Sequence, residues 1–174
     1  MPLQKLSLVL GGASSGKSAF AERLVVASGR PKVYLATAEA WDLEMQEKIA
    51  RHRDMRGPSW RTVEEPRATA GALGEISPTE AVLLDCATLW LTNQMLADAD
   101  LGAAEAELAE ALASCPAPVV VVSNEVGLGL VPDTPLGRRF RNAQGALNQR
   151  LAAQADLVVF VAAGLPLVLK GTLP

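Results

Sequence analysis

The segment Gly11-Gly-Ala-Ser-Ser-Gly-Lys-Ser18 directly follows the apolar run Leu6-Ser-Leu-Val-Leu10. The pattern G-x-x-x-x-G-K-[ST], placed after a strand and before a helix, is typical of a phosphate-binding loop (P-loop). Its backbone N–H groups can surround an anion, Lys17 can reach the outer phosphates of a nucleotide, and the Ser18 hydroxyl can coordinate Mg²⁺. The helix predicted to follow adds the positive end of its dipole to the same place. This segment therefore predicts an α/β fold that binds a nucleoside triphosphate.

Short apolar segments rich in Val and Leu alternate with helical patterns along the rest of the chain. Strands are predicted over residues 5–10, 33–36, 81–85, 118–123, 156–162 and 166–170. Helices are predicted over residues 18–28, 43–56, 88–97, 103–114 and 136–155, the last with Leu136, Phe140, Leu147 and Leu151 on one face. Strands without strict alternation are typical of a parallel sheet that is covered on both faces. We therefore predict a single-domain P-loop NTPase fold over residues 1–174, with a mostly parallel sheet and helices on both faces.

Two further segments shape this prediction. The last two strands are separated by only a few residues around Gly164, which favours an antiparallel hairpin and hence one antiparallel edge strand. Residues 57–78 contain three prolines and three glycines and form the least regular part of the sequence. We predict a mobile flap there, beside the site.

The composition limits the possible partners and location. The chain has 174 residues, of which 49% are hydrophobic and 20% charged, so it can bury a sizeable core. A net charge of −3 leaves no basic footprint for nucleic acid. The most apolar stretch, residues 157–169, is too short to span a bilayer. Cys86 and Cys115 lie outside any metal-ligand spacing, and no secretory signal precedes the P-loop, so we expect two buried thiols in a cytoplasmic protein.

Polar residues follow three of the predicted strands, where the ligand crevice of a parallel sheet is expected. Asp85 ends an apolar strand and can hold Mg²⁺ or its water shell, although an Asp there can also simply cap the next helix. Thr37 can contact nucleotide or substrate, or can be a strand-end residue without a role. Asn124 and Glu125 enter a glycine-containing loop that is a candidate site loop.

His52 is the only histidine of the chain. Lys48 and Arg56 lie four residues to either side, on the same face of the predicted helix. These positive charges disfavour the imidazolium form, and a neutral imidazole is a nucleophile. The residues alone do not distinguish this role from that of a solvated surface histidine.

Several segments, in this order, resemble the bifunctional adenosylcobinamide kinase / adenosylcobinamide-phosphate guanylyltransferase family of cobalamin biosynthesis. The resemblance is carried by the P-loop and by Tyr34-Leu-Ala-Thr-Ala38, Ile49-Ala-Arg-His-Arg-Asp54, Trp60-Arg-Thr-Val-Glu64, Leu83-Leu-Asp-Cys86, Thr92-Asn93, Asn124-Glu-Val-Gly-Leu-Gly-Leu-Val-Pro132 and the segment 138–151. Some relatives carry Glu in place of Asp85 and a second His in place of Arg51.

The resemblance implies a two-step reaction. The family phosphorylates adenosylcobinamide with ATP or GTP, and then transfers GMP from GTP to that phosphate through a guanylylated histidine, for which His52 is the match. It also implies a homotrimer with sites between subunits. From the residues themselves we expect Lys17 to act as a second catalytic residue, with Mg²⁺ held by Ser18 and Asp85, because both cations can neutralise the pyrophosphate as it leaves. The nucleotide contacts that the resemblance implies are Gly11, Gly12, Ala13, Ser14, Ser15, Gly16, Lys17, Ser18, Ala36, Thr37, Ala38, Arg53, Asp54, Met55, Arg56, Glu64 and Asp85.

Two alternatives remain at this point. The first is a simple P-loop kinase of a small molecule or nucleotide, in which His52 takes no part. The second is a nucleotide-dependent regulatory module, which is disfavoured because no Lys of the sequence is followed two residues later by Asp, as guanine-reading switches require.

Overall fold

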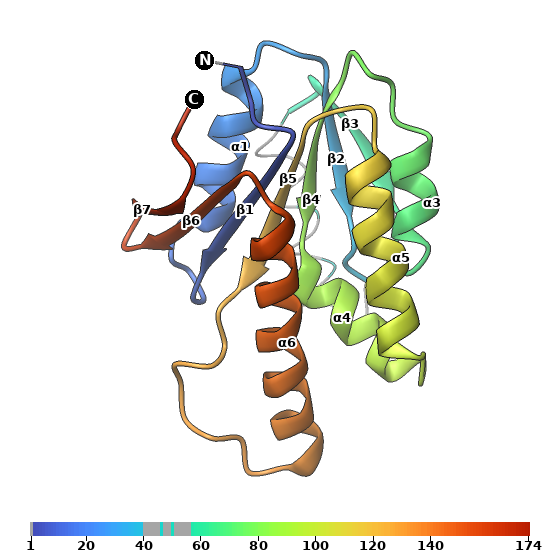
Figure 1. Cartoon of the computed structure of the whole chain (residues 1–174), viewed down its shortest axis with the longest axis vertical. Helices are drawn as coiled ribbons and strands as arrows, with labels where there is room; N and C mark the ends of the chain where they lie inside the picture. The colour runs from blue at the N-terminus through green and yellow to red at the C-terminus, as the bar shows by residue number, and fades with distance from the viewer. Residues whose placement is uncertain (1, 40–45, 47–49, 51–56) are drawn as a thin grey trace.

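The computed structural model describes residues 2–39, 46, 50 and 57–174, which are built around one seven-stranded sheet (Figure 1). The strands are β1 (Leu6–Gly11), β2 (Lys32–Ala36), β3 (Trp60–Glu64), β4 (Ala81–Asp85), β5 (Val119–Asn124), β6 (Leu157–Ala162) and β7 (Leu165–Lys170). Their order in space is β3-β2-β4-β5-β1-β6-β7. All neighbouring pairs are parallel except β6 and β7, which are antiparallel. The predicted parallel sheet with one antiparallel edge strand is therefore confirmed.

Helices cover both faces of the sheet, as predicted. One face carries α1 (Lys17–Ala27), whose Phe20 and Leu24 pack in one buried cluster with Val9 of β1. The other face carries α3 (Thr69–Gly74), α4 (Ala87–Leu96), α5 (Leu101–Ser114) and α6 (Pro135–Gln154). Leu8 of β1 belongs to the buried cluster on that side. Successive residues of β1 thus enter opposite core layers, as the pleat of a strand requires.

The first residues of the two longest helices that the structure describes, α5 and α6, are set by side chains that cap their N-termini. Asp100 accepts a hydrogen bond from the backbone N–H of Ala103 at 3.1 Å and so caps α5. Thr134 caps α6 in the same way by accepting from Gly137 N at 3.0 Å, and Pro135 occupies the first helical position. Each cap satisfies a backbone donor that has no acceptor within its own helix.

The structure corrects two predictions. Residues 57–78, expected to be an irregular flap, contain the edge strand β3 and the short helix α3. β3 was missed because an edge strand of five half-exposed residues lacks the continuous apolar pattern of the central strands. The predicted apolar face of α6 is also too long. Leu147 and Leu151 are buried, and Phe140 packs against the core cluster to which they belong. Leu136 is 55% exposed because the first turn of α6 extends beyond the sheet.

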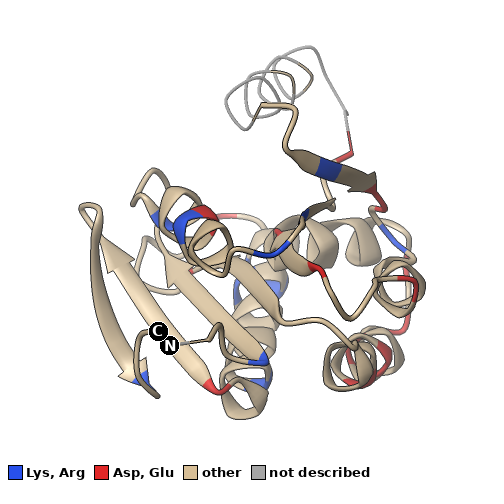
Figure 2. Ribbon diagram, turned by 90° about the horizontal axis from the view of Figure 1, so that it is seen from above, with Lys and Arg blue, Asp and Glu red and all other residues tan. Residues whose placement is uncertain are grey.

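Both cysteines are buried and neither forms a disulfide, which agrees with the expectation from their spacing. Among the helices of the described segments, none combines the length and apolar character needed to cross a bilayer. The β6–β7 hairpin is poor in charge: Lys170 is the one charged residue of its two strands, and its ribbon is correspondingly almost entirely tan in Figure 2.

Candidate nucleotide-binding site

The P-loop runs from the end of β1 at Gly11 to the start of α1 at Lys17. Gly16 is the N-cap of α1 with φ of 91°, a left-handed conformation that glycine adopts without steric cost. A Cβ added to Gly16 would lie 3.0 Å from the Cα of Gly164, so the position is also crowded. The first N–H groups of α1 have no acceptor within the helix. The loop therefore presents backbone donors and a positive helix end to an anion, as the sequence predicts.

The side chain of Lys17 folds back over this loop. Its Nζ atom donates a hydrogen bond of 3.0 Å to the carbonyl oxygen of Gly12. Ser18 follows in the first turn of α1, with a half-buried side chain. A cation and a hydroxyl group therefore lie at the start of the same helix.

Three of the predicted contact residues lie at one level across neighbouring strands. Ala36 pairs with Asp85 on one side and with Glu64 on the other. On the far side of β4, β5 pairs with β1 so that Asn124 is opposite Gly11. The carboxyl ends of the parallel strands thus bring residues from distant parts of the chain to one edge of the sheet.

The carboxylate of Asp85 is oriented by Tyr34, whose hydroxyl donates a hydrogen bond of 2.9 Å to Asp85 Oδ2. Asp85 does not cap the following helix. The N-cap of α4 is Cys86, whose Sγ accepts from the backbone N–H of Leu89 at 3.4 Å. The helix-capping role that was the alternative for Asp85 is therefore taken by Cys86.

Burial and two nearby charges act on the thiol of Cys86. Burial raises the pKa of the Cys86 thiol to about 12, and the negative charge of Asp85 contributes in the same direction. The positive charge of Lys17 acts in the opposite direction. The strand register puts Asp85 and the start of the P-loop at the same edge of the sheet, since Asp85 pairs with Val122 of β5 and Gly11 pairs with Asn124 of the same strand.

Hard oxygen ligands are available for a divalent cation. In the part of the chain that the structure describes, no three His, Cys, Asp or Glu side chains gather as a metal-binding cluster. Mg²⁺ does not need such a cluster, since it commonly takes one or two protein oxygens together with phosphate oxygens and water. The hydroxyl of Ser18 and the carboxylate of Asp85 fit that requirement.

Thr37 is fully buried and its side chain is engaged by the backbone. Its Oγ1 atom donates to the carbonyl oxygen of Cys86 at 2.7 Å and accepts from Cys86 N at 2.8 Å. The amide of Asn93 donates to Thr37 O at 2.7 Å and to Pro66 O at 3.0 Å. Thr37 and Asn93 therefore hold the ends of β2, β3 and β4 together, and a nucleotide contact of Thr37 stays a prediction.

The loop that begins at Asn124 and Glu125 is anchored beside the P-loop. Thr88 Oγ1 accepts from Asn124 N at 2.8 Å, and Asn148 donates to Asn124 O at 3.0 Å. The next residue, Glu125, donates its backbone N–H to Gly11 O at 3.0 Å. These bonds place the predicted site loop at the same edge as the P-loop.

One support of the P-loop was not predicted from the sequence. The turn of the β6–β7 hairpin reaches it, because Gly164 N donates a hydrogen bond of 2.8 Å to Ser15 O. The sequence marks Gly164 as a turn residue, but no local signal connects it with a loop that lies about 150 residues earlier.

The predicted nucleophile lies outside the described residues. This holds for His52 and for the neighbouring Arg53, Asp54, Met55 and Arg56, together with most of the helix predicted over residues 43–56. Their roles stay predictions.

Comparison with known proteins supports the resemblance. Residues 7–169 match the family model "Cobinamide kinase / cobinamide phosphate guanyltransferase". The chain is 47% identical over 167 residues to the bifunctional adenosylcobalamin biosynthesis protein CobP of Pseudomonas aeruginosa, covering 94% of this chain and 96% of the relative. It is 40% identical over 180 residues to the corresponding protein CobU of Salmonella typhimurium, covering 94% and 98%.

The solved structures show similarity in fold alone. The flagellar accessory protein FlaH of Methanocaldococcus jannaschii superimposes with a TM-score of 0.55 at 12% sequence identity, over 98% of this chain and 80% of that one.

Proposed function

Since the chain belongs to the family described as cobinamide kinase / cobinamide phosphate guanyltransferase, we propose that it phosphorylates adenosylcobinamide and then guanylylates the product through His52. Family membership makes it a bifunctional transferase of cobalamin biosynthesis. The identity of the substrate as adenosylcobinamide, the use of ATP or GTP in the first step and the covalent histidine are parts of the proposal. So is the assignment of residues 1–174 to one kinase/guanylyltransferase domain.

The observation that carries the proposal is that the P-loop, with Lys17 bonded over it, lies at the same edge of the sheet as Asp85, in a chain that matches the family over nearly its whole length. In the kinase step, the hydroxyl oxygen of adenosylcobinamide attacks the γ-phosphorus of the nucleotide. The bond from that phosphorus to the β-phosphate oxygen breaks, and the hydroxyl proton leaves to solvent. Lys17 and the loop N–H groups stabilise the charge on the transferring group, so no covalent protein residue is needed.

In the guanylyl step, a nitrogen of neutral His52 attacks the α-phosphorus of GTP. An N–P bond forms, the bond to the β-phosphate oxygen breaks, and pyrophosphate leaves. A phosphate oxygen of the first product then attacks the same phosphorus, which restores the free histidine and forms adenosylcobinamide-GDP. Two successive displacements avoid bringing two polyanions together in one transition state.

Ser18 and Asp85 would hold Mg²⁺, which when bound neutralises phosphate charge. The proposed contacts of Ala36, Ala38 and Glu64 with nucleotide are supported by their places at the carboxyl edge of β2 and β3. We also propose that the enzyme acts in the cytoplasm as a homotrimer.

The test uses GTP labelled at the α-phosphate, with the wild-type protein and the His52→Ala variant. The wild-type protein is expected to retain acid-labile, base-stable label after denaturation, as a phosphoramidate does. The variant is expected to retain none and to lose guanylyl transfer by at least about 100-fold, while phosphorylation of adenosylcobinamide continues.

A surface change that spares the site is the matched control. Glu107→Gln, on the exposed side of α5, should label as the wild-type protein does. Unchanged GMP transfer by His52→Ala would refute the covalent step and would favour a plain kinase. Absence of any transfer to adenosylcobinamide by the wild-type protein would refute the proposed substrate.

A further inference from the structure

The loop between β5 and α6, residues 125–134, exposes large apolar side chains to water. Leu128 is 84% exposed, Leu130 is 96% exposed, and Val131 beside them is 62% exposed. Leu136, at the start of α6, continues this surface at 55%. Exposed apolar side chains that cluster on one loop mark a binding surface more often than scattered ones do.

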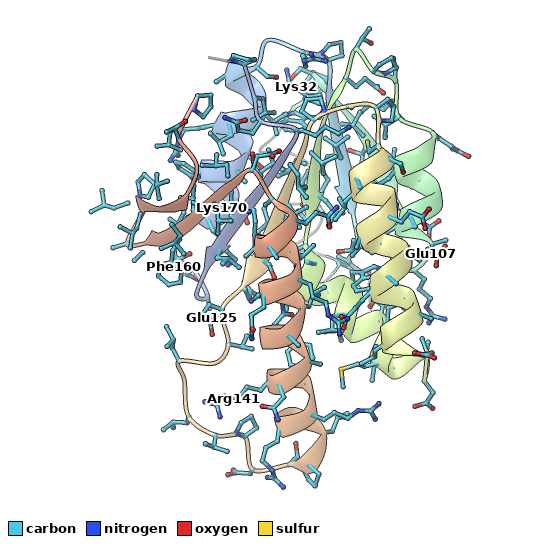
Figure 3. The ribbon with its side chains drawn as sticks, viewed as in Figure 1. Lys32, Glu107, Glu125, Arg141, Phe160 and Lys170 are labelled. Carbon is cyan, nitrogen blue, oxygen red and sulfur yellow. The ribbon has the colours of Figure 1, made fainter. Side chains whose placement is uncertain are left out.

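Hydrogen bonds from α6 hold the backbone of this apolar loop. Arg141 of α6 donates through Nη2 to the carbonyl oxygen of Gly127 at 2.6 Å, and Arg138 donates through Nη1 to Pro132 O and Asp133 O at 3.0 and 2.9 Å. Figure 3 shows Glu125 where the loop leaves β5 and Arg141 on the part of α6 that runs beside the loop. Bonds from α6 to both ends of the loop hold its backbone in place.

The end of the loop also packs closely on α6. A Cβ added to Gly137 would lie 2.7 Å from Pro132 Cβ and 3.0 Å from Thr134 Oγ1, so the first turn of α6 approaches the loop as only glycine permits. The leucines are therefore exposed by a defined backbone conformation and not by local unfolding.

The apolar loop starts at the nucleotide site. Glu125 N donates to Gly11 O at 3.0 Å, and Asn124 is paired with Gly11 across the β1–β5 ladder. The loop therefore extends outward from the P-loop edge, so a molecule resting on it can reach the nucleotide site with a flexible arm.

We propose that the exposed face of the apolar loop, centred on Leu128 and Leu130, binds the corrin macrocycle of the substrate. This inference rests on the proposed function. The macrocycle is too large to enter between the strand ends, so it must lie outside while its hydroxyl arm reaches the γ-phosphate to within about 3–3.5 Å. Its methyl-bearing, partly apolar faces match the exposed leucine side chains.

Among the described loops at this edge of the sheet, the others do not combine large exposed apolar side chains with a position confined to the nucleotide site. The loop after β3 carries the polar residues Glu65 and Arg67, and the residues that start α4 after β4 are buried. The hairpin turn after β6 leads to Leu165, which is 72% exposed, but β7 continues exposed and apolar to Leu169 at the opposite edge. The apolar surface of β7 is thus not confined to the nucleotide site.

The test is the double variant Leu128→Ser/Leu130→Ser. Its dissociation constant for adenosylcobinamide, measured by equilibrium dialysis without nucleotide, is expected to rise at least about tenfold, since two leucine side chains no longer remove apolar surface from water on binding. The KM for adenosylcobinamide should rise in parallel, while the KM for GTP and the molecular mass in solution stay unchanged.

Two control variants separate this role from general effects. Leu128→Met/Leu130→Met keeps the apolar surface and should bind adenosylcobinamide as the wild-type protein does. Val26→Ser removes an apolar side chain that is 53% exposed at the far end of α1, away from the P-loop, and should also leave binding unchanged.

The outcomes are distinguishable. Unchanged corrinoid binding by the serine variant would overturn the inference while leaving the proposed function intact. A lower molecular mass of that variant would also overturn it, because the leucines would then join subunits. If the wild-type protein binds adenosylcobinamide through these leucines but transfers nothing to it, the inference stands and the proposed function fails. Absence of corrinoid binding by the wild-type protein would overturn both.

Discussion

Tyr34 of β2 donates a hydrogen bond of 2.9 Å from its hydroxyl to Oδ2 of Asp85, on the neighbouring strand β4. The two residues come from separate strands and meet only because β2 and β4 are adjacent in the sheet. The bond fixes the rotation of a carboxylate that lies at the end of β4, at the carboxyl edge of the sheet. A carboxylate whose orientation is fixed in advance loses less freedom when it binds a cation.

Replacement of Tyr34 by Phe is expected to weaken the use of Mg²⁺. The variant loses one hydrogen bond, so the free energy of unfolding should fall by only about 1 kcal/mol. The Mg²⁺ concentration that gives half-maximal kinase activity should rise roughly tenfold, because the carboxylate of Asp85 is no longer oriented. Titration of activity with Mg²⁺ at saturating nucleotide measures this. An unchanged half-saturation point would mean that Asp85 acts without support from Tyr34.

Replacement of Lys17 by Ala should abolish tight binding of the triphosphate. The side chain lies over the P-loop and bonds Gly12 O at 3.0 Å, so its removal takes away a cation aimed at the outer phosphates. The dissociation constant of a non-hydrolysable GTP analogue, measured by calorimetry, should rise by at least about 100-fold.

Lys32 is the matched control for Lys17. It starts β2 at the opposite edge of the sheet (Figure 3), and its Nζ atom lies 5.9 Å from the centre of the Trp60 ring. Lys32→Ala removes the same charge and should leave the dissociation constant within about a factor of two, since surface charges away from the site contribute little. Equal losses in both variants would mean that overall charge, and not the position of Lys17, controls binding.

Substitution of Ala for glycine should have opposite effects at two positions. Gly16→Ala places a side chain at φ of 91°, 3.0 Å from Gly164 Cα, and should lower the free energy of unfolding by about 1–2 kcal/mol. Gly145 lies inside α6, and apart from its own chain neighbours and helix backbone no atom lies within 4 Å of an added Cβ, so Gly145→Ala should raise the free energy of unfolding by about 0.5–1 kcal/mol. Urea unfolding of both variants measures the difference. Effects of the same sign would contradict the assigned backbone conformation of Gly16.

The buried thiol of Cys86 should make stability depend on alkaline pH. Burial raises the pKa of Cys86 to about 12 in the folded protein, whereas an exposed thiol ionises near pH 8.5. Because the folded pKa is the higher one, its contribution to stability is complete below about pH 8.5 and is lost as the pH rises towards 12. At pH 10 the loss is on the order of 2 kcal/mol.

The comparison of wild type with Cys86→Ala, unfolded in urea under reducing conditions at pH 7 and pH 10, isolates this effect. The wild-type protein should lose more stability between the two pH values than the variant does. Equal losses would mean that the thiol ionises in the folded state, and alkylation of Cys86 in the native protein at pH 9 would indicate the same.

Much of the fold could be predicted because its signals are local. The strand, glycine loop and helix around Lys17 form one continuous segment, and the central strands are continuous apolar runs. Their predicted ends agree with the structure to within about two residues. The short link at Gly164 leaves room only for a hairpin, so the antiparallel edge strand was also predictable. β3 was not, since a half-exposed edge strand takes its structure from hydrogen bonds with β2 rather than from its own composition.

The sequence by itself determined the P-loop, the α/β class and the candidate residues at strand ends, because short-range hydrophobic patterns and glycine positions specify these. Only the tertiary structure decided which of these residues meet. Strand order sets Tyr34 against Asp85, and the return of the chain at Gly164 brings it to Ser15. The helical pattern of the sequence predicted Leu136 on the buried face of α6. In the tertiary structure Leu136 is exposed to solvent, because the sheet ends before the first turn of that helix. Neighbours across a sheet are chosen by the packing of the whole chain, and no local stretch of residues encodes that choice.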